Sequence, residues 1–585
     1  MNEPQSEPQR PRTLALFTEW TADEFGGLPA LRGGPEAIPD VSYEELRHRV
    51  RAIARGLLGL GVAKGDRVAI LAETRPEWTY AHFAVLATGA VLVPVYPTAG
   101  DEEVTWVLSD SAATVVLVED AAQAEKVARL RPQLPGLRHV VHMTGDDAPL
   151  HMDRLGDSVP EAEQLARAES VTDDDLSTII YTSGTTGLPK GCRLTHGNSA
   201  AIRDATEGFQ QQNPGDCTYI YLPLAHLLAQ LTEMATLLGG STLHYFGGRI
   251  ENIVAELGQA QPTHLPSVPR LFEKVHAQVQ ALAEAQGADG RDRFEAAIRT
   301  GVEVDELRAA GQEPTGELLQ RYEEADAKLF SLVRAAFGGR LRHANSGGAP
   351  IAPQTLDFLR ACGIPLYEGY GMTESAGVIS LNHPGAFRHG TVGKPIPGCE
   401  VRIAGDGEIL ARGPMIFSGY HANAAATAEA LDADGWLHTG DLGSLDDDGY
   451  LRVTGRKKDI VITSAGKNLT PSQVEFAIQQ SRWVSRAIMI GDRRPHPVAL
   501  ITLDEEEVGR LDLTGPPARE PRVRELVQEA VDAANEQVAR PARVRAFAIL
   551  DEDLSIDSGA LTPTLKVRRA QVARLYAKEI DALYE

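Results

Sequence analysis

The stretch between Tyr181 and Gly191 concentrates groups that could hold a phosphate. It runs Tyr181-Thr182-Ser183-Gly184-Thr185-Thr186-Gly187-Leu188-Pro189-Lys190-Gly191. It directly follows residues 176–180, a short apolar run that predicts a buried strand. A loop leaving a strand with free backbone N–H groups, several hydroxyl donors and one cation suits phosphate oxygens. The sequence therefore predicts a phosphate-binding loop.

The spacing of this loop differs from the Walker loop, G-x-x-x-x-G-K-[ST], because Lys190 follows Pro189 and precedes Gly191. A linker rich in Gly, Ser and Thr is the plain alternative, but linkers seldom separate a hydrophobic strand from an ordered Arg-Leu-Thr-His run. The loop resembles the signature of the adenylate-forming superfamily, which includes acyl-CoA synthetases, luciferases and nonribosomal adenylation domains. The resemblance implies that this loop binds ATP through Thr182, Ser183, Gly184, Thr185, Thr186, Gly187 and Lys190, with Thr182 and Lys190 also acting in catalysis.

Two motifs further along the chain suit an adenine ring. The first is Asn345-Ser346-Gly347-Gly348-Ala349-Pro350, and the second is Tyr367-Glu368-Gly369-Tyr370-Gly371-Met372-Thr373-Glu374. Adjacent glycines leave a flat backbone surface on which an aromatic base can lie. Either motif alone could be an ordinary turn, but both follow the phosphate loop in order.

The family resemblance assigns roles to these two motifs. It implies that adenine lies between the backbone of Gly347, Gly348, Ala349 and Pro350 on one side and Tyr370 and Gly371 on the other. Thr373 would hold the α-phosphate. Glu374 would act in catalysis by facing Mg²⁺, a hard cation that prefers oxygen ligands.

Two more segments carry a carboxylate and basic groups. Trp436-Leu437-His438-Thr439-Gly440-Asp441 contains Asp441, which matches the family aspartate that accepts the ribose hydroxyls. Gly455-Arg456-Lys457-Lys458-Asp459 contains Arg456, which matches the second ribose contact of the family, and Lys458, which matches the hinge of the family's C-terminal domain. The resemblance also implies that Gly466 and Lys467 line the path of coenzyme A. Residues 446–450, between Asp441 and Arg456, predict a turn between strands, and their acidic run is expected to be solvated rather than a metal site.

A lysine stands near the end of the chain, in Leu561-Thr562-Pro563-Thr564-Leu565-Lys566-Val567-Arg568-Arg569. Lysine is a point charge on a long stem and can reach a phosphate and a carboxylate together. A basic helix start is the plain alternative. The segment closely resembles the end of long-chain fatty acyl-CoA synthetases, which implies that Lys566 binds ATP and drives adenylation. Other branches of the superfamily have Gly where this chain has Leu565.

Two features of the sequence bear on which acyl substrate binds. His226 follows the predicted strand 219–224, and the resemblance places it in the acyl pocket together with Gly348 and Gly371. Residues 276–340 predict long, charged helices, with Leu318, Leu319, Tyr322, Ala325, Leu329 and Phe330 forming one buried stripe at helical spacing. Taken alone the stripe is a packing element. Long-chain synthetases resemble this chain in carrying such a helical insert, which favours a long acyl chain.

The elements that must position these residues alternate between strand and helix. Helices are expected at 43–58, 78–86, 102–108 and 121–130, and strands at 67–71, 91–93, 113–118 and 139–141. This alternation predicts an α/β fold with layered, mostly parallel sheets covered by helices. The C-terminal part mixes strands 487–490 and 498–502 with helices 524–539 and 566–583, which predicts a small, mobile α+β lid domain.

Length and composition limit the classes of protein. The 585 residues predict more than one domain: a disordered tail 1–12, an AMP- and acyl-binding domain 13–455, and a lid 456–585. A formal net charge of -24 argues against binding nucleic acid or anionic lipid without a local basic patch. The four cysteines, Cys192, Cys217, Cys362 and Cys399, are too widely spaced to indicate zinc or disulfides, and we expect buried thiols.

The N-terminal residues 1–12 are polar and lack an apolar core, so a cytoplasmic protein without a secretory signal is expected. The longest apolar run, about residues 82–96, is too short for a membrane span. A peripheral contact with a membrane stays open, as does the oligomeric state.

The resemblance spans residues 43–569 and implies a long-chain fatty-acid–CoA ligase that uses ATP, Mg²⁺ and coenzyme A. Four alternatives remain: a fatty-acyl-AMP ligase that loads a carrier protein, a CoA ligase for a medium-chain or aromatic acid, a luciferase-like monooxygenase, and an inactive nucleotide-binding regulator. The regulator is disfavoured because Thr373, Glu374, Asp441 and Lys566 are all present.

Overall fold

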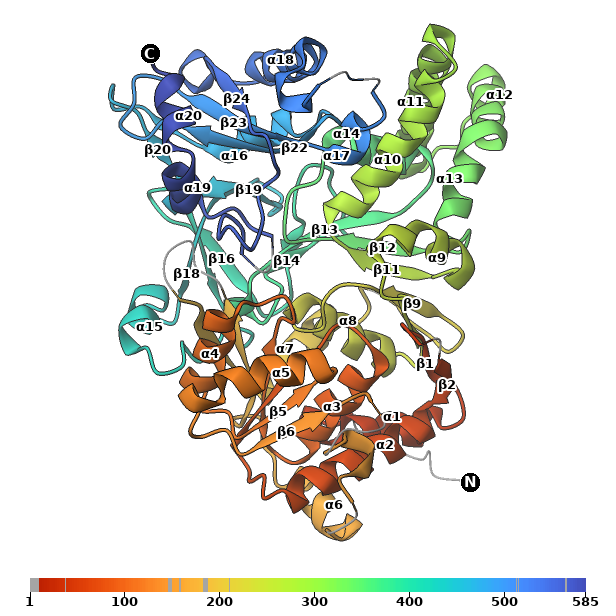
Figure 1. The fold of residues 1–585 in the computed structure, drawn as a ribbon. Helices are drawn as coiled ribbons and strands as arrows, with labels where there is room; N and C mark the ends of the chain where they lie inside the picture. Colours follow the sequence, from red (N-terminus) through yellow and green to blue (C-terminus); the bar gives the residue numbers. More distant parts are fainter. Residues whose placement is uncertain are drawn as a thin grey trace. The chain divides into compact units, whose positions relative to one another are not determined.

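The computed structural model describes residues 10–36, 38–145, 150–156, 159–182, 188–209, 211–511, 513, 515–562 and 565–585. The chain divides into two compact units (Figure 1). The first comprises residues 1–182, 189–400 and 411–437, and the second comprises 183–188, 401–410 and 438–585. The domain boundary expected at 455/456 stays a prediction. Of the expected tail, residues 1–9 lie outside the described residues, and Arg10 and Arg12 form ion pairs with Glu207 and Asp173.

The first unit contains a six-stranded sheet that ends in the phosphate-loop strands. Its order is β6-β5-β3-β4-β7-β8, formed by His139–His142, Val115–Val118, Arg67–Leu71, Val91–Val95, Leu176–Thr182 and Lys190–Thr195. The first five strands are parallel, and only β8 runs antiparallel to its neighbour. The apolar strand runs are buried on both faces because helices cover both faces, as is usual for parallel sheets.

The helices on the two faces of this sheet come from the alternating segments of the sequence. Tyr43–Gly59 (α2) and Pro76–Ala87 (α3) pack on the face that carries Val68 and Ile70. Asp101–Asp110 (α4) and Ala121–Leu130 (α5) pack on the opposite face. All four expected helices and all four expected strands of this region are present, with bounds that differ by at most two residues.

A nine-stranded sheet carries the adenine motifs. Its order is β15-β14-β13-β12-β11-β9-β10-β1-β2, formed by Lys394–Pro395, Ser380–Leu381, Leu366–Tyr370, His343–Ser346, His264–Ser267, Cys217–Ile220, Thr242–Tyr245, Pro29–Gly33 and Ile38–Ser42. The six central strands are parallel, and the strands at both edges are antiparallel. The predicted α/β class with mostly parallel sheets is confirmed.

The remaining helices of the first unit pack around the two sheets. They are Phe17–Phe25 (α1), Glu161–Glu169 (α6), His196–Thr206 (α7), Leu227–Leu238 (α8), Ile253–Ala260 (α9), Pro353–Ala361 (α14) and Ala424–Ala430 (α15). A buried polar contact fixes α8 against α3: Glu233 Oε2 lies 2.7 Å from His82 Nδ1, and the Thr79 hydroxyl donates to Glu233 Oε1. Buried carboxylates require such partners, so the position of α8 is well defined.

The predicted helical segment is present but begins earlier than residue 276. It consists of Pro269–Glu284 (α10), Ala288–Ala309 (α11), Gly316–Ala325 (α12), a π-helical turn at Asp326–Phe330 and Ser331–Ala336 (α13). Proline at the first helical position suits the start at Pro269. Figure 1 shows α11 and α12 side by side. The guanidinium of Arg308 on α11 lies 5.0 Å from the centroid of the Tyr322 ring on α12.

The expectation of one buried stripe in this segment was wrong. Of its six residues only Phe330 is buried, whereas Leu318, Leu319, Tyr322, Ala325 and Leu329 are half-buried, and α12 has no buried residue. The helix packs chiefly against α11. A stripe at helical spacing therefore predicted which side contacts a neighbour but overstated how much of it is covered.

The second unit is an α+β structure. It contains most of a four-stranded sheet in the order β16-β17-β18-β19, formed by Glu400–Ile403, Glu408–Arg412, Leu437–Leu445 and Leu451–Arg456. It also contains a hairpin of Val461–Ile462 (β20) and Asn468–Leu469 (β21), and a three-stranded sheet of Val484–Ile490 (β22), Val498–Leu503 (β23) and Phe547–Ile549 (β24). Its α-helices are Pro471–Ile478 (α16), Glu505–Val508 (α17), Pro521–Glu536 (α18), Arg569–Leu575 (α19) and Ala577–Ala582 (α20).

The single helix predicted over residues 566–583 was wrong. Two shorter helices, α19 and α20, meet at Tyr576, and the first begins three residues after Lys566. The residues at the predicted start instead fold back on the chain before them: the Thr562 N–H donates to the Lys566 carbonyl at 2.9 Å, and Leu561 bridges to Val567. The backbone at Lys566 therefore belongs to a turn and not to a helix.

All four cysteines are buried free thiols, as predicted. Burial raises the pKa of each of them, to about 11 for Cys217 and about 12 for Cys362 and Cys399. Within the described part of the chain, the helices are too short or too polar to cross a lipid bilayer.

Candidate active site

The phosphate loop closes a hairpin. Strand β7 ends at Thr182 and β8 begins at Lys190, and these two residues are direct cross-strand partners. Ser183, Gly184, Thr185, Thr186 and Gly187 lie outside the described residues. The sequence predicted the strand before the loop but gave no sign of the antiparallel return through β8. The hairpin holds the Thr182 and Lys190 ends of the loop next to each other.

Glu374 lies beside this hairpin and is 7% exposed. It belongs to the short 3-10 helix Thr373–Ser375, directly after β13. The buried Cys192 thiol lies 3.7 Å from the Thr182 hydroxyl, and both burial and the charge of Glu374 raise the pKa of Cys192. The predicted Thr182 and Glu374 are thus brought together around one thiol.

Tyr420 completes this cluster and was missed by the sequence analysis. Its hydroxyl donates to Glu374 Oε1 at 2.7 Å, and Lys190 Nζ lies 5.0 Å from the centroid of its ring. Burial and the neighbouring Glu374 carboxylate raise the pKa of the phenol. A tyrosine without a motif around it gave no signal that could have identified it. Tyr420 orients the carboxylate and gives the Lys190 cation an aromatic face.

The two adenine motifs leave adjacent parallel strands at the same sheet edge. In the register of β12 and β13, Ser346 is the partner of Glu368. Residues 347–350 follow the end of β12, while Tyr370 ends β13 and Gly371 and Thr373 follow it. Ligands of α/β sheets bind outside the carboxyl ends of the strands. The structure brings the two predicted halves of the adenine site to one such edge.

The two glycines assigned to both the adenine and acyl sites, Gly371 and Gly348, differ in why the backbone favours glycine. A Cβ on Gly371 would lie 2.3 Å from the Gly377 carbonyl oxygen, so no side chain fits there. Gly348 has open space around it but a φ of +80°, which favours glycine. Both positions therefore have a backbone reason for glycine in addition to the one that the ligand would supply.

His226 has a structural role. It is the N-cap of α8, where its Nδ1 accepts a hydrogen bond from the Leu228 N–H at 3.2 Å. The helix itself is fixed through Glu233, as described above. A role of His226 in an acyl pocket stays a prediction.

The ribose candidates are cross-strand neighbours in the second unit. Asp441 on β18 pairs with Arg456 on β19, and Arg456 Nε lies 2.9 Å from Asp441 Oδ1. The turn predicted at residues 446–450 joins these strands, and this hairpin is what brings together two residues 15 positions apart. Asp441 is 5% exposed. Arg456 therefore pairs with a buried carboxylate at the ribose position that the sequence predicts.

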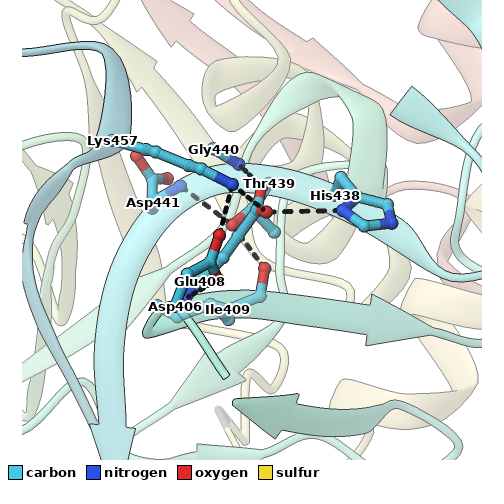
Figure 2. Close-up of polar contacts among 8 residues, drawn as sticks. All are labelled: Asp406, Glu408, Ile409, His438, Thr439, Gly440, Asp441 and Lys457. Atoms are coloured by element: carbon cyan, nitrogen blue, oxygen red, sulfur yellow. Dashed lines mark hydrogen bonds and ion pairs between the residues drawn. The ribbon is translucent and has the colours of Figure 1, made fainter. Parts of the chain in front are cut away.

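The segment that leads to Asp441 is held by Glu408, a second residue that the sequence analysis missed. The Gly440 N–H donates to Glu408 Oε1 at 2.9 Å, and the Thr439 hydroxyl donates to the Ile409 carbonyl at 2.7 Å (Figure 2). Glu408 lies 32 positions before Gly440, and no periodicity connects them.

The residues assigned to coenzyme A lie in a tight turn between β20 and β21. Gly466 has a φ of +71°, and its N–H donates to the Thr463 carbonyl, while the Lys467 N–H donates to the Thr463 hydroxyl. Lys458 lies in the 3-10 turn Lys457–Asp459. These contacts explain a glycine at 466 by local geometry, and a coenzyme A path along this turn stays a prediction.

Lys566 is exposed, and its backbone lies opposite that of Thr562. Its backbone N–H donates to the Thr562 hydroxyl at 3.0 Å, so the turn fixes the base of the side chain. Leu565, where other branches have Gly, adopts a φ of +60°. The left-handed conformation explains why glycine is common at that place.

Comparison with known proteins identifies the family. The family model described as "AMP-binding enzyme" matches residues 18–421, and the model described as "AMP-binding enzyme C-terminal domain" matches residues 458–585. The chain belongs to the AMP-binding enzymes. The sequence resemblance to this superfamily is thereby confirmed.

Curated relatives of this AMP-binding enzyme cover nearly the whole chain. It is 41% identical over 563 residues to the long-chain-fatty-acid–CoA ligase FadD15 of Mycobacterium bovis, covering 93% of this chain and 92% of the relative. The protein of the same name in Mycobacterium tuberculosis shows the same identity and coverage. The long-chain-fatty-acid–CoA ligase ACSBG2 of Xenopus laevis is 30% identical, over 98% of this chain and 84% of the relative.

Solved structures share the fold. The adenylation domain of a carboxylate reductase from Mycobacterium chelonae has a TM-score of 0.74 at 22% identity, covering 100% of this chain and 92% of that domain. The anthranilate CoA ligase AuaEII, in complex with anthranoyl-AMP, has a TM-score of 0.73 at 20% identity, covering 100% of both chains. A fatty acyl CoA synthetase of Mycobacterium tuberculosis has a TM-score of 0.63 at 22% identity, covering 97% of this chain and 99% of that chain.

The residues of this AMP-binding enzyme fit a Mg²⁺ ion that binds together with ATP. Mg²⁺ is usually held by one or two carboxylates, substrate phosphates and water. Glu374 supplies one carboxylate whose Oε1 is fixed by Tyr420. Among the described residues, no group of three or more His, Cys, Asp or Glu side chains suits a metal site made by protein alone.

Replacing Leu565 with glycine should stabilise this AMP-binding enzyme. A side chain at φ of +60° strains the folded state by about 1–2 kcal/mol, and glycine removes this strain. Glycine also has more conformational freedom in the unfolded chain, which offsets about 0.5–1 kcal/mol of the gain. Leu565 is 53% exposed, so little burial is lost. We expect a gain of about 0.5–1 kcal/mol in the free energy of unfolding of the second unit, measured by urea denaturation.

Leu565→Ala is the matched control, because it removes the same side chain but keeps the Cβ that causes the strain. It should give no gain. A Leu565→Gly variant less stable than Leu565→Ala would show that the backbone at this turn is not strained.

Proposed function

We propose that this AMP-binding enzyme is a long-chain-fatty-acid–CoA ligase. It activates a fatty acid with ATP to an acyl-adenylate and then transfers the acyl group to coenzyme A, releasing pyrophosphate and AMP. The observation that carries the proposal is 41% identity, over 93% of the chain, to proteins named long-chain-fatty-acid–CoA ligase. Glu374, Asp441 and Lys566 support it as the groups that such a reaction needs.

In the first half-reaction, an oxygen of the fatty carboxylate attacks the α-phosphorus of ATP and pyrophosphate leaves. Thr182 and Lys190, at the two ends of the phosphate loop, hold the departing phosphates. Lys566 neutralises the charge that develops between the carboxylate and the α-phosphate. Glu374, oriented by Tyr420, would hold Mg²⁺, which supplies electrostatic stabilisation of the phosphates when bound.

In the second half-reaction, the thiol of coenzyme A attacks the acyl carbonyl as a thiolate and AMP leaves. We propose that the lid, residues 456–585, turns about Lys458 between the two halves. Coenzyme A would then pass Gly466 and Lys467, where the space around Gly466 is open. Asp441 and Arg456 keep the ribose in place through both halves.

Chain-length dependence tests the proposal. A hydrocarbon tunnel gains about 0.8 kcal/mol per buried methylene, so four carbons fewer should cost up to about 3 kcal/mol. That is about a hundredfold in kcat/KM. The measurement is AMP release with coenzyme A for even-numbered acids from acetate to stearate, each below its critical micelle concentration.

A rise of kcat/KM toward long chains supports the proposal. An optimum at acetate, or at an aromatic acid such as a cinnamate, would overturn the long-chain substrate while leaving the ligase chemistry. Acyl-adenylate formation without any acyl-CoA product would point instead to a ligase that loads a carrier protein.

A further inference from the structure

Glu408 is a buried carboxylate at the start of β17, and only 5% of it is exposed. Three groups from distant parts of the second unit converge on it (Figure 2). Its Oε1 accepts from the Gly440 N–H at 2.9 Å, and its Oε2 lies 3.1 Å from Lys457 Nζ and 3.3 Å from His438 Nδ1. Neither the motifs nor the family resemblance assigns Glu408 a role.

The partners keep Glu408 charged. Burial alone would raise the pKa of this carboxyl, but Lys457, the Gly440 N–H and His438 together hold it below its usual value. Removing one partner of a buried charge is costly, because the remaining charge is left without compensation. The contacts of Glu408 are therefore coupled to one another.

On one side, Glu408 fixes the approach to Asp441. Gly440 has a φ of +71°, and its N–H reaches back to Glu408. The neighbouring Thr439 hydroxyl donates to the Ile409 carbonyl and accepts the Asp441 N–H at 3.1 Å. The segment before Asp441 is thus held to β17 at two successive residues, so the direction of the Asp441 carboxylate depends on β17.

On the other side, Glu408 fixes the residue directly before the hinge. Lys457 Nζ lies 3.1 Å from Glu408 Oε2 and 2.5 Å from Asp406 Oδ2. These two carboxylates raise the pKa of Lys457, and Asp406 is the larger cause. The lysine is half-exposed, but one of its partners is buried, so the pair is screened less by salt than a surface ion pair.

We propose that Glu408 is a positioning residue that joins the ribose-binding aspartate to the hinge. It holds Asp441 through Gly440 and pins Lys457, so that the chain up to Lys457 stays with the ribose site and rotation begins at Lys458. This inference rests on the proposed function for its catalytic consequence. The other part, that Glu408 couples Asp441 to the segment before Lys458, requires only that this AMP-binding enzyme binds a nucleotide.

The test uses the full-length protein with three variants. Glu408→Gln keeps an oxygen acceptor for Gly440 but loses the charge that pairs with Lys457, Lys457→Gln removes the cation, and Glu408→Ala removes both contacts. Glu400→Gln is the control, because Glu400 forms an exposed pair with Arg412 on a neighbouring strand and touches none of these groups.

Two readouts separate the two contacts. AMP affinity, measured by calorimetry, should fall about tenfold in Glu408→Ala and stay within about twofold in Lys457→Gln. Amide hydrogen exchange of residues 458–462 should become about tenfold faster in Glu408→Gln and Lys457→Gln. The double variant Glu408→Gln/Lys457→Gln should be no faster than Lys457→Gln alone, because that single variant already removes the pair between Glu408 and Lys457.

The catalytic consequence is a changed ratio of the two half-reactions in Lys457→Gln, with the KM for ATP unchanged. Wild-type AMP affinity in Glu408→Ala, or wild-type exchange at the hinge in Lys457→Gln, would overturn the inference. A wild-type protein that binds AMP but forms no acyl-CoA would instead overturn the proposed function, while the affinity and exchange measurements still decide the role of Glu408.

Discussion

Replacing Lys566 with alanine should slow pyrophosphate release by about 10²- to 10³-fold, the usual effect of removing one preorganised electrostatic contact from a transition state. The Thr562 hydroxyl accepts a hydrogen bond from the Lys566 backbone N–H, so the base of this exposed side chain is held in place. Alanine removes the ammonium without disturbing the backbone contacts. The measurement is single-turnover pyrophosphate release with ATP and a long-chain acid.

The second half-reaction provides the internal control for Lys566→Ala. Thioester formation from supplied acyl-adenylate should survive, because the charge of Lys566 is needed only while pyrophosphate leaves. Lys578→Ala is the matched variant, since it removes an exposed lysine from α20 of the same unit. Equal losses in both half-reactions would show that Lys566 supports the structure of the lid rather than adenylation.

The parts of the fold that could be predicted are those controlled by local pattern. Strand β3 and helix α5 begin and end at the predicted residues, because the apolar period and the flanking turn residues lie within the element itself. The pairing of Asp441 with Arg456 was also within reach, since a predicted turn at 446–450 makes a hairpin that places residues on either side opposite each other.

The parts that could not be predicted depend on contacts between distant segments. Tyr420 reaches Glu374 across 46 positions, and Glu408 reaches Gly440 across 32. A hydrogen bond of this kind leaves no period in the sequence, and both residues lie outside the recognised motifs. The sequence analysis therefore identified the residues expected to contact the ligand, but it missed Tyr420 and Glu408, which orient them.

The wrong helix over 566–583 has a different origin. The charged and apolar residues there do have helical spacing, and α19 and α20 use it. The left-handed conformation of Leu565 and the Thr562–Lys566 hydrogen bond commit the first residues to a turn, and these features depend on backbone geometry rather than on side-chain pattern. The sequence showed that Leu565 stands where other branches have Gly, but only the φ angle shows that this residue is left-handed.

Replacing Glu374 with glutamine should lower kcat/KM for MgATP in adenylation by about 10²-fold. Glutamine has nearly the same volume and can still accept the hydrogen bond of Tyr420, so the packing around this 7% exposed side chain is kept. What it loses is the negative charge that would attract Mg²⁺. The Mg²⁺ concentration that gives half-maximal pyrophosphate release should therefore rise together with the loss of rate.

Two controls separate the charge of Glu374 from its surroundings. Tyr420→Phe leaves the carboxylate charged and removes one hydrogen bond to it, so it should cost less than Glu374→Gln, about tenfold. Glu400→Gln removes an exposed negative charge and should change neither rate nor Mg²⁺ requirement. If pyrophosphate release falls in Glu374→Gln while the Mg²⁺ requirement stays the same, the carboxylate does not hold the metal. Because Tyr420 donates to this carboxylate and its ring lies against Lys190 Nζ, the role of Glu374 would then be to orient Lys190 through the tyrosine.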